Sequence, residues 1–126
     1  MSGWTPRTWT GLAAVSGLLA VGFGAFGAHG VHDPKAAEWL RIGSQYQMAH
    51  ALAVFAAFGL HRAGAKGMGA AAALFLVGSL IFAGSLYAMA LGAPRVLGAI
   101  TPIGGVSFMI GWALLAWRAF TLRDQA

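Results

Sequence analysis

The chain has 126 residues, of which 59% are apolar and only 9% carry a charge, and its mean hydropathy is +0.73. Because about a quarter of the residues in ordinary soluble domains are charged, this composition predicts one integral membrane domain over residues 1–126. The absence of cysteine excludes disulfides, thiolate iron–sulfur clusters and cysteine zinc sites. The net charge of +5 comes from Lys and Arg near expected helix ends, which favours contact with membrane lipids over nucleic acid.

The first of four apolar segments predicts a membrane helix at about residues 9–28. A helix needs about 20 residues to cross ~30 Å of hydrocarbon. A polar segment with Trp4 and Arg7 precedes this helix. The apolar run is longer than the core of a secretory signal, so we expect an uncleaved span.

The second helix is expected at about residues 34–60. Asp33 followed by Pro34 is typical of a helix start, because Asp accepts backbone N–H groups there and Pro fits the first turn. The first turns carry the charged residues Lys35, Glu38 and Arg41. We therefore expect these turns to lie in or above the lipid headgroups.

The third and fourth helices are expected at about residues 68–91 and 101–120, joined by a loop at 92–100. Thr101 and Pro102 predict a cap at the start of the fourth helix. The connections are short, so the sequence predicts an all-α, up-and-down bundle of four transmembrane helices.

Basic residues predict the orientation of this bundle. An even number of spans places both termini on one side of the membrane, and five basic residues fall on that side: Arg7, Arg62, Lys66, Arg118 and Arg123. Three fall on the other side: Lys35, Arg41 and Arg95. The positive-inside rule then places both termini in the cytoplasm.

Small residues recur along the expected helices at spacings that place them on faces. The glycines of these faces are Gly17, Gly24, Gly27, Gly78, Gly84, Gly104 and Gly111. In lipid, such faces allow helix backbones to approach closely, so we interpret them as packing seams. A glycine-lined path for a permeant is the alternative for the first helix.

The polar side chains of the second helix gather at Tyr46, Gln47 and His50. Polar groups in hydrocarbon need partners, so we expect this polar centre to face inward. The candidate partners on the later helices are Ser79, Ser85, Tyr87, Thr101 and Ser107. A hydrogen-bond network that sets packing is the favoured interpretation. A proton or ligand site and an axial haem or quinone contact remain alternatives.

Two motifs suggest chemistry only weakly. Ser85 and His50 are candidates for a nucleophilic dyad, but no acid inside the expected spans orients the histidine, so we do not expect an enzyme. His29, His32 and Asp33 form a partial metal-ligand set. Helix capping and headgroup contact explain them better, and we expect neither a metal nor another cofactor.

Four motifs resemble a known family. They are Gly-Ala-Phe-Gly-Ala-His-Gly at 24–30, Tyr-Gln-Met-Ala-His-Ala-Leu-Ala at 46–53, Gly-Ser-Leu-Tyr-Ala-Met-Ala-Leu at 84–91, and Thr-Pro-Ile-Gly-Gly-Val-Ser-Phe-Met-Ile-Gly-Trp at 101–112. The chain resembles the domain-of-unknown-function family numbered 423, small bacterial inner-membrane proteins with a eukaryotic relative called transmembrane protein 256. The resemblance covers about residues 9–118.

The resemblance implies a four-helix, multi-pass protein of the bacterial inner membrane with no assigned activity, so no catalytic role is carried over. It marks the positions His29, Tyr46, Gln47, His50, Gly84, Ser85, Tyr87, Thr101, Pro102, Gly104 and Gly105.

We expect a non-enzymatic accessory or self-assembling protein, either a homo-oligomer or a subunit of a larger membrane complex. The first alternative is a homo-oligomeric channel or transporter for a small solute or protons, with His50 lining the path. A subunit of a redox membrane complex is the second alternative.

Overall fold

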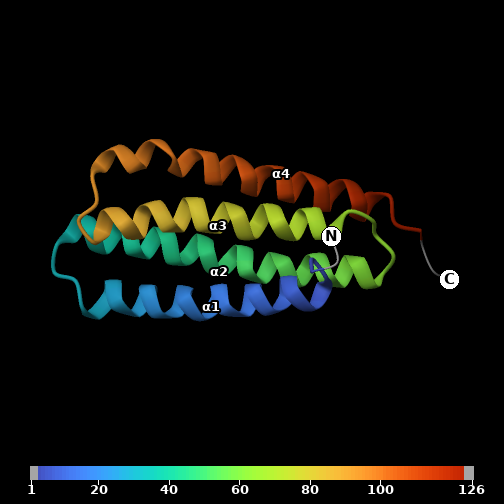
Figure 1. Ribbon diagram of the computed structural model, residues 1–126, viewed down its shortest axis with the longest axis horizontal. Coiled ribbons are helices and arrows are strands. Elements are labelled where there is room, and N and C mark those ends of the chain that lie inside the picture. The colour runs from blue at the N-terminus through green and yellow to red at the C-terminus, as the bar shows by residue number, and fades with distance from the viewer. Residues whose placement is uncertain (1–2, 124–126) are drawn as a thin grey trace.

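The computed structural model describes residues 3–123, so residues 1–2 and 124–126, Asp124 among them, lie outside the described residues. The elements are α1 (Pro6–His29), α2 (Pro34–Arg62), α3 (Met68–Ala90), the 3-10 helix η1 (Arg95–Ala99) and α4 (Thr101–Phe120) (Figure 1). Residues 3–123 contain no strand. The all-helical prediction is confirmed, and η1 lies in the segment predicted as a loop.

The four helices run up and down in chain order, with α2 and α3 inside and α1 and α4 outside (Figure 1). Helix α1 packs on α2 and α4 packs on α3, whereas no close backbone contact joins α1 to α4 within the described residues. Helix α1 begins and α4 ends at the same end of the molecule, beside the α2–α3 turn. The outer faces of α1 and α4 are therefore uncovered.

Side-chain caps explain the starts of α1 and α2. Helix α1 begins three residues before the prediction, because the Thr5 hydroxyl accepts the Thr8 N–H at 3.4 Å and Pro6 occupies the first turn. At α2, Asp33 Oδ2 accepts the Ala36 N–H at 2.9 Å, as predicted.

The predicted cap of α4 by Thr101 is wrong, although Pro102 lies in the first turn of the helix as predicted. Ile100 occupies the cap position with φ −92° and ψ −18°, and its carbonyl accepts the Ile103 N–H at 3.0 Å. Because η1 leads directly into α4, Thr101 already lies inside the helix. Its hydroxyl contacts the Ser85 hydroxyl instead of a backbone N–H.

Close approach between helices depends on glycine. A Cβ added to Gly27 of α1 would lie 2.7 Å from Leu40 Cβ on α2, and one added to Gly104 of α4 would lie 2.6 Å from the backbone nitrogen of Phe82 on α3. The other seam glycines that meet a neighbouring helix within 4 Å are Gly17, Gly24, Gly78 and Gly111. Gly84 does not belong to these seams, because a Cβ there would meet nothing within 4 Å.

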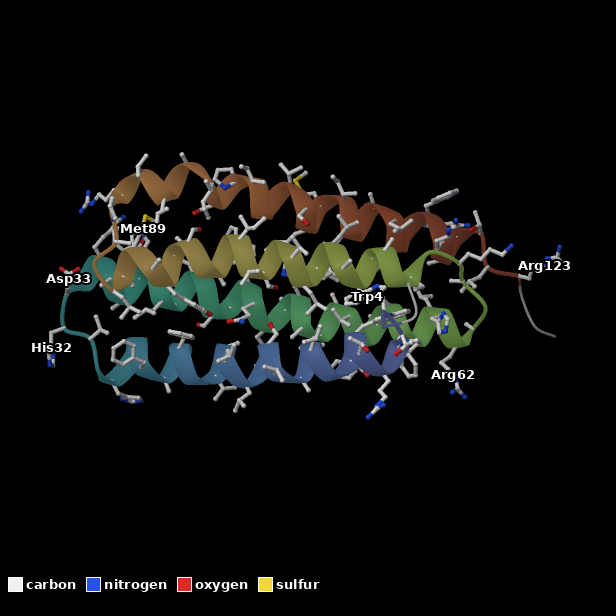
Figure 2. The ribbon with its side chains drawn as sticks, in the orientation of Figure 1. Trp4, His32, Asp33, Arg62, Met89 and Arg123 are labelled. Atoms are coloured by element: carbon white, nitrogen blue, oxygen red, sulfur yellow. The ribbon has the colours of Figure 1, made fainter. Side chains whose placement is uncertain are left out.

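Three helical segments are long and apolar enough to cross a membrane: α1, α3 and Arg95–Phe120. Helix α2 misses this criterion because charged first turns and a polar middle lower its hydropathy. Most of the large apolar side chains left exposed lie on the two outer helices, α1 and α4. Charged side chains gather at the two ends of the bundle, as with Asp33 at one end and Arg62 and Arg123 at the other (Figure 2).

Candidate functional site

Gln47 lies near the middle of α2 and links three helices. Its side chain is only 7% exposed. The Tyr87 hydroxyl on α3 donates to Gln47 Oε1 at 2.6 Å, and Gln47 Nε2 donates to the Ser16 hydroxyl on α1 at 3.1 Å. The oxygen and the nitrogen of the Gln47 amide therefore each have a partner on another helix. These two bonds fix how α1, α2 and α3 are aligned along their lengths.

His50 lies one turn further along α2 and connects it to α4. Its Nδ1 bonds the Tyr46 carbonyl oxygen at 2.6 Å, and the Trp112 indole N–H donates to its Nε2 at 3.0 Å. A carbonyl only accepts and an indole only donates, so the proton sits on Nδ1 and Nε2 is the acceptor. The neutral imidazole is thus fully satisfied by groups of the same chain.

Aromatic rings enclose this histidine. The His50 ring stacks on Phe108 with centroids 3.5 Å apart and planes 9° apart, and Phe75 lies 5.6 Å away. On the other side of the centre, Phe23 of α1 stacks on Tyr87 with centroids 4.0 Å apart. Apolar rings therefore pack against both the His50 imidazole and the Tyr87 ring.

The side chain of Tyr46 lies outside the buried centre, contrary to the inward orientation that we expected. It is 47% exposed and packs against Phe82 with ring centroids 4.7 Å apart. No side-chain hydrogen bond of Tyr46 is found within residues 3–123, but its backbone carbonyl accepts from His50 Nδ1 and its ring lies parallel to the His50 ring with centroids 6.2 Å apart. Tyr46 therefore contributes to the centre through its backbone carbonyl and through ring packing.

The remaining predicted polar residues form separate contacts between α3 and α4. Ser85 donates to the Phe82 carbonyl at 3.0 Å and contacts the Thr101 hydroxyl, while Ser107 donates to the Leu74 carbonyl at 2.7 Å. The predicted polar centre is therefore divided into a network around α2 and a separate set of contacts between α3 and α4, and Ser85, Thr101 and Ser107 have no hydrogen bond to Gln47 or His50 in the described part of the chain.

Ser85 and His50 make no hydrogen bond to each other in that part of the chain, and each has other partners. A dyad for nucleophilic catalysis requires direct hydrogen-bond reach, so this arrangement lacks its first geometric requirement.

The loop motif between α1 and α2 serves the start of α2. His29, His32 and Asp33 are all exposed, and Asp33 uses its carboxylate to cap the helix. His32 and Asp33 are seen at the end of the bundle in Figure 2. Among the described residues, no three His, Asp or Glu side chains are grouped so that they hold a metal ion.

The sequence interpretation missed two members of the centre, Ser16 and Trp112. Ser16 is the one hydroxyl residue within residues 11–28, which was a usable signal. Trp112 lies in the middle of α4, whereas tryptophans at a membrane surface lie near helix ends. A tryptophan at mid-span needs a partner for its N–H, and His50 is that partner.

Comparison with known proteins identifies the family. The model of a family described as "Protein of unknown function (DUF423)" matches residues 23–105. The chain belongs to the DUF423 family. The residues that the family model matches include Gln47, His50 and Tyr87, while Ser16 and Trp112 lie outside the matched range.

Relatives from several bacteria support the assignment. The chain is 43% identical over 112 residues to a UPF0382 membrane protein of Haemophilus influenzae, covering 86% of this chain and 90% of the relative. It is 41% identical over 113 residues to the UPF0382 membrane protein YwdK of Bacillus subtilis, covering 86% and 92%. It is 37% identical over 117 residues to the UPF0382 inner membrane protein YgdD of Escherichia coli K12, covering 90% and 89%.

No solved structure matches the chain significantly. The relatives are named as membrane proteins without an activity, so the comparisons agree with a small bacterial membrane protein and add no reaction.

Proposed function

We propose that this protein is a non-enzymatic, four-span protein of the bacterial inner membrane that works through helix association, as a self-assembling unit or an accessory subunit. Both termini face the cytoplasm. The observation that carries the proposal is that both ends of the Gln47 amide and both ring nitrogens of His50 are hydrogen-bonded within the chain. A polar centre of this kind holds helices in register and leaves their outer faces available.

The length and packing of α2 support a fourth span. Residues 42–60 contain no Asp, Glu, Lys or Arg. Nineteen helical residues extend about 28 Å at 1.5 Å each, close to the ~30 Å hydrocarbon core. Helix α2 lies between α1 and α3 and runs alongside both (Figure 1). Its buried polar groups find partners on the neighbouring helices, which compensates for its lower hydropathy.

The distribution of basic residues supports the proposed orientation. Arg7, Arg62, Lys66, Arg118 and Arg123 belong to the end that holds the α2–α3 turn. Lys35, Arg41 and Arg95 belong to the other end. The more basic end faces the cytoplasm under the positive-inside rule.

The outer face of α1 supports association. A Cβ added to Gly11 or Gly22 would meet nothing within 4 Å, and Leu18 beside them is 71% exposed. Exposed glycines in a lipid-facing helix allow another helix to approach closely. This face is free for a second copy or for a subunit of another protein.

The geometry gives less support to the channel and redox alternatives. A proton path along His50, or a haem iron bound at its Nε2, would have to displace the Trp112 N–H. The ring is also stacked tightly against Phe108. Both alternatives therefore require the histidine to leave a fully satisfied arrangement.

Native mass spectrometry of the tagged protein, purified from its own host's membranes in a mild detergent, tests the proposal. A stoichiometric foreign subunit supports the accessory role, and a homo-oligomer supports self-assembly. A monomer alone, in detergent and in native lipid nanodiscs, would contradict the proposal.

A matched pair of variants tests the α1 face. We expect Gly22→Leu to weaken the association, whereas Gly59→Leu, at another position with open space around its Cβ, leaves it intact.

Reconstituted vesicles test the channel alternative. Proton flux that His50→Gln abolishes in a folded protein would favour a transport role.

A further inference from the structure

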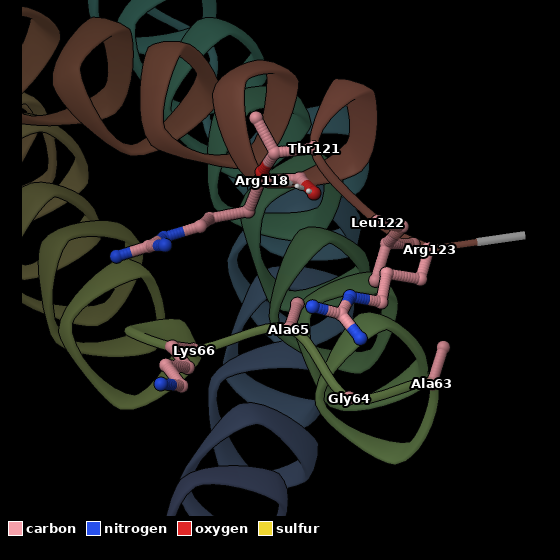
Figure 3. A pocket seen from close by; sticks show the side chains of 8 residues that line it. All are labelled: Ala63, Gly64, Ala65, Lys66, Arg118, Thr121, Leu122 and Arg123. Carbon is pink, nitrogen blue, oxygen red and sulfur yellow. Dashed lines mark hydrogen bonds between the residues drawn. The ribbon is translucent and has the colours of Figure 1, made fainter.

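A pocket of about 460 Å³ lies where the α2–α3 turn meets the end of α4 (Figure 3). Lys66 comes from the turn, while Arg118 and Arg123 come from α4 and the segment after it. Two segments that are about fifty residues apart in the sequence therefore bring three cationic side chains to one cavity.

These cations have no acidic partner within residues 3–123. The acids in that part of the chain are Asp33 and Glu38, and both belong to the opposite end of the bundle, where Figure 2 places Asp33. Glu38 pairs with Lys35 at 3.9 Å, at that same distant end. The pocket therefore has a positive charge that the described residues leave uncompensated.

The start of α3 adds to this positive charge. Gly67 precedes the helix with φ +79°, and no side chain caps the first turn. A Cβ added to Gly67 would lie 3.8 Å from Arg118 Nε, so the guanidinium group borders the helix start. The N-terminus of a helix carries a partial positive charge, and a guanidinium beside it is repelled unless an anion lies between them.

Arg118 also has an unused donor. Its Nε is buried and has no hydrogen-bond partner among the described residues, although its guanidinium carbon stacks over the Trp117 ring at 4.1 Å. A buried donor without a partner is unfavourable, so an acceptor beside it would stabilise this arrangement. The stacking occupies one face of the guanidinium, and its terminal N–H groups donate no hydrogen bond within the described residues.

We propose that this pocket binds a phosphate group through Arg118, Lys66 and the start of α3. Phosphate accepts paired hydrogen bonds from a guanidinium and binds at helix N-termini. The headgroup of an anionic lipid and a free phosphate share this chemistry. The lipid source rests on the proposed membrane orientation, which places this end of the helices at the cytoplasmic headgroups, whereas the phosphate site itself does not.

The test uses the purified full-length protein in detergent. Native mass spectrometry with added dioleoyl phosphatidylglycerol or dioleoyl phosphatidylcholine measures lipid retention, and isothermal titration calorimetry measures binding of inorganic phosphate. We expect Arg118→Gln and Lys66→Gln each to weaken binding of phosphatidylglycerol by about tenfold, the loss of one charge-assisted hydrogen bond. Arg7→Gln removes the same charge at the same end without touching the pocket, so it should retain binding.

The outcomes separate the two sources. Preferential binding of phosphatidylglycerol that Arg118→Gln and Lys66→Gln reduce supports a lipid site. The same variant pattern with inorganic phosphate, without preference between the lipids, supports a site for free phosphate. Equal losses in Arg7→Gln and Arg118→Gln would overturn the proposal, because they would indicate only general attraction to the basic surface.

Folding is checked for each variant by circular dichroism. Lys66 lies in a turn, so its variant keeps the test decisive if Arg118→Gln fails to fold. Normal binding by a folded Lys66→Gln would also overturn the proposal. The association tests on α1 do not depend on the phosphate-binding measurements. A pocket that binds no phosphate would therefore overturn this inference without contradicting the proposed function.

Discussion

Gln47→Met offers a direct measure of the polar centre. The substitution keeps the length of the side chain and removes the bonds to Tyr87 and Ser16. Two hydrogen bonds inside a membrane protein contribute about 1.2 kcal/mol at ~0.6 kcal/mol each. Ser16 can turn its hydroxyl to its own helix backbone, but the Tyr87 hydroxyl is left buried, at a cost of about 1 kcal/mol or more. We therefore expect a destabilisation of about 2 kcal/mol.

The assay is reversible unfolding in mixed micelles, followed by tryptophan fluorescence. Gln45→Met is the matched control, because Gln45 is exposed on the same helix, and it should change the free energy of unfolding by less than about 0.5 kcal/mol. The double variant Gln47→Met with Tyr87→Phe should be less destabilised than the sum of its single variants, since the unpaired hydroxyl is gone. Equal effects of Gln47→Met and Gln45→Met would refute the assigned network.

Three further predictions test packing, orientation and chemistry. Gly104→Ala should destabilise the α3–α4 contact by about 1–3 kcal/mol, because its Cβ would lie 2.6 Å from the Phe82 nitrogen, whereas Gly84→Ala, with open space around it, should unfold like the wild type in the same assay. The chain has no cysteine, so His32→Cys should react with a membrane-impermeant maleimide in intact spheroplasts and Ala63→Cys only after lysis; the reverse pattern would invert the proposed orientation. A serine-directed fluorophosphonate should label wild type and Ser85→Ala equally, and labelling that depends on Ser85 would contradict the non-enzymatic proposal.

Helix positions were predictable because the chain marks most of its helix starts locally. Asp33 and Pro34 predict the start of α2, and Gly67, with its positive φ, separates α2 from α3. The same logic applied to Thr5 and Pro6 would have found the true start of α1. At Thr101 the local pattern gave a wrong cap. The preceding 3-10 helix already supplies helical backbone, so no residue with an extended backbone is present to act as the cap.

The partners in the polar centre were harder to predict because they depend on the register between helices. The spacing of Gln47 and His50 indicates a polar face on α2, and Tyr87 was among the candidate partners. No local sequence pattern predicts that Ser16 of α1 bonds the Gln47 amide or that Trp112 of α4 bonds the His50 imidazole. These pairings follow from which helices are neighbours and how far each is shifted along the other.

Tyr46 and Gly84 show the limit of reasoning from a helical wheel. Tyr46 lies close to His50 on the wheel, but the small difference in direction leaves its side chain half exposed while His50 is buried. Gly84 directly precedes Ser85, and a shift of one residue turns a helix by about 100°. Ser85 therefore faces α4 and Gly84 faces open space.

Helix α2 is the least apolar helix and also the one that depends most on its neighbours. In the proposed orientation its amide and imidazole lie within hydrocarbon, where an unpaired polar group costs several kcal/mol. Ser16, Tyr87 and Trp112 remove that cost, and each comes from a different helix. In the proposed four-span arrangement, tertiary contacts therefore stabilise α2 in the membrane more than its own hydropathy does. Under that proposal the polar centre has a structural purpose without any bound ligand, because the membrane position of α2 depends on the correct assembly of α1, α3 and α4.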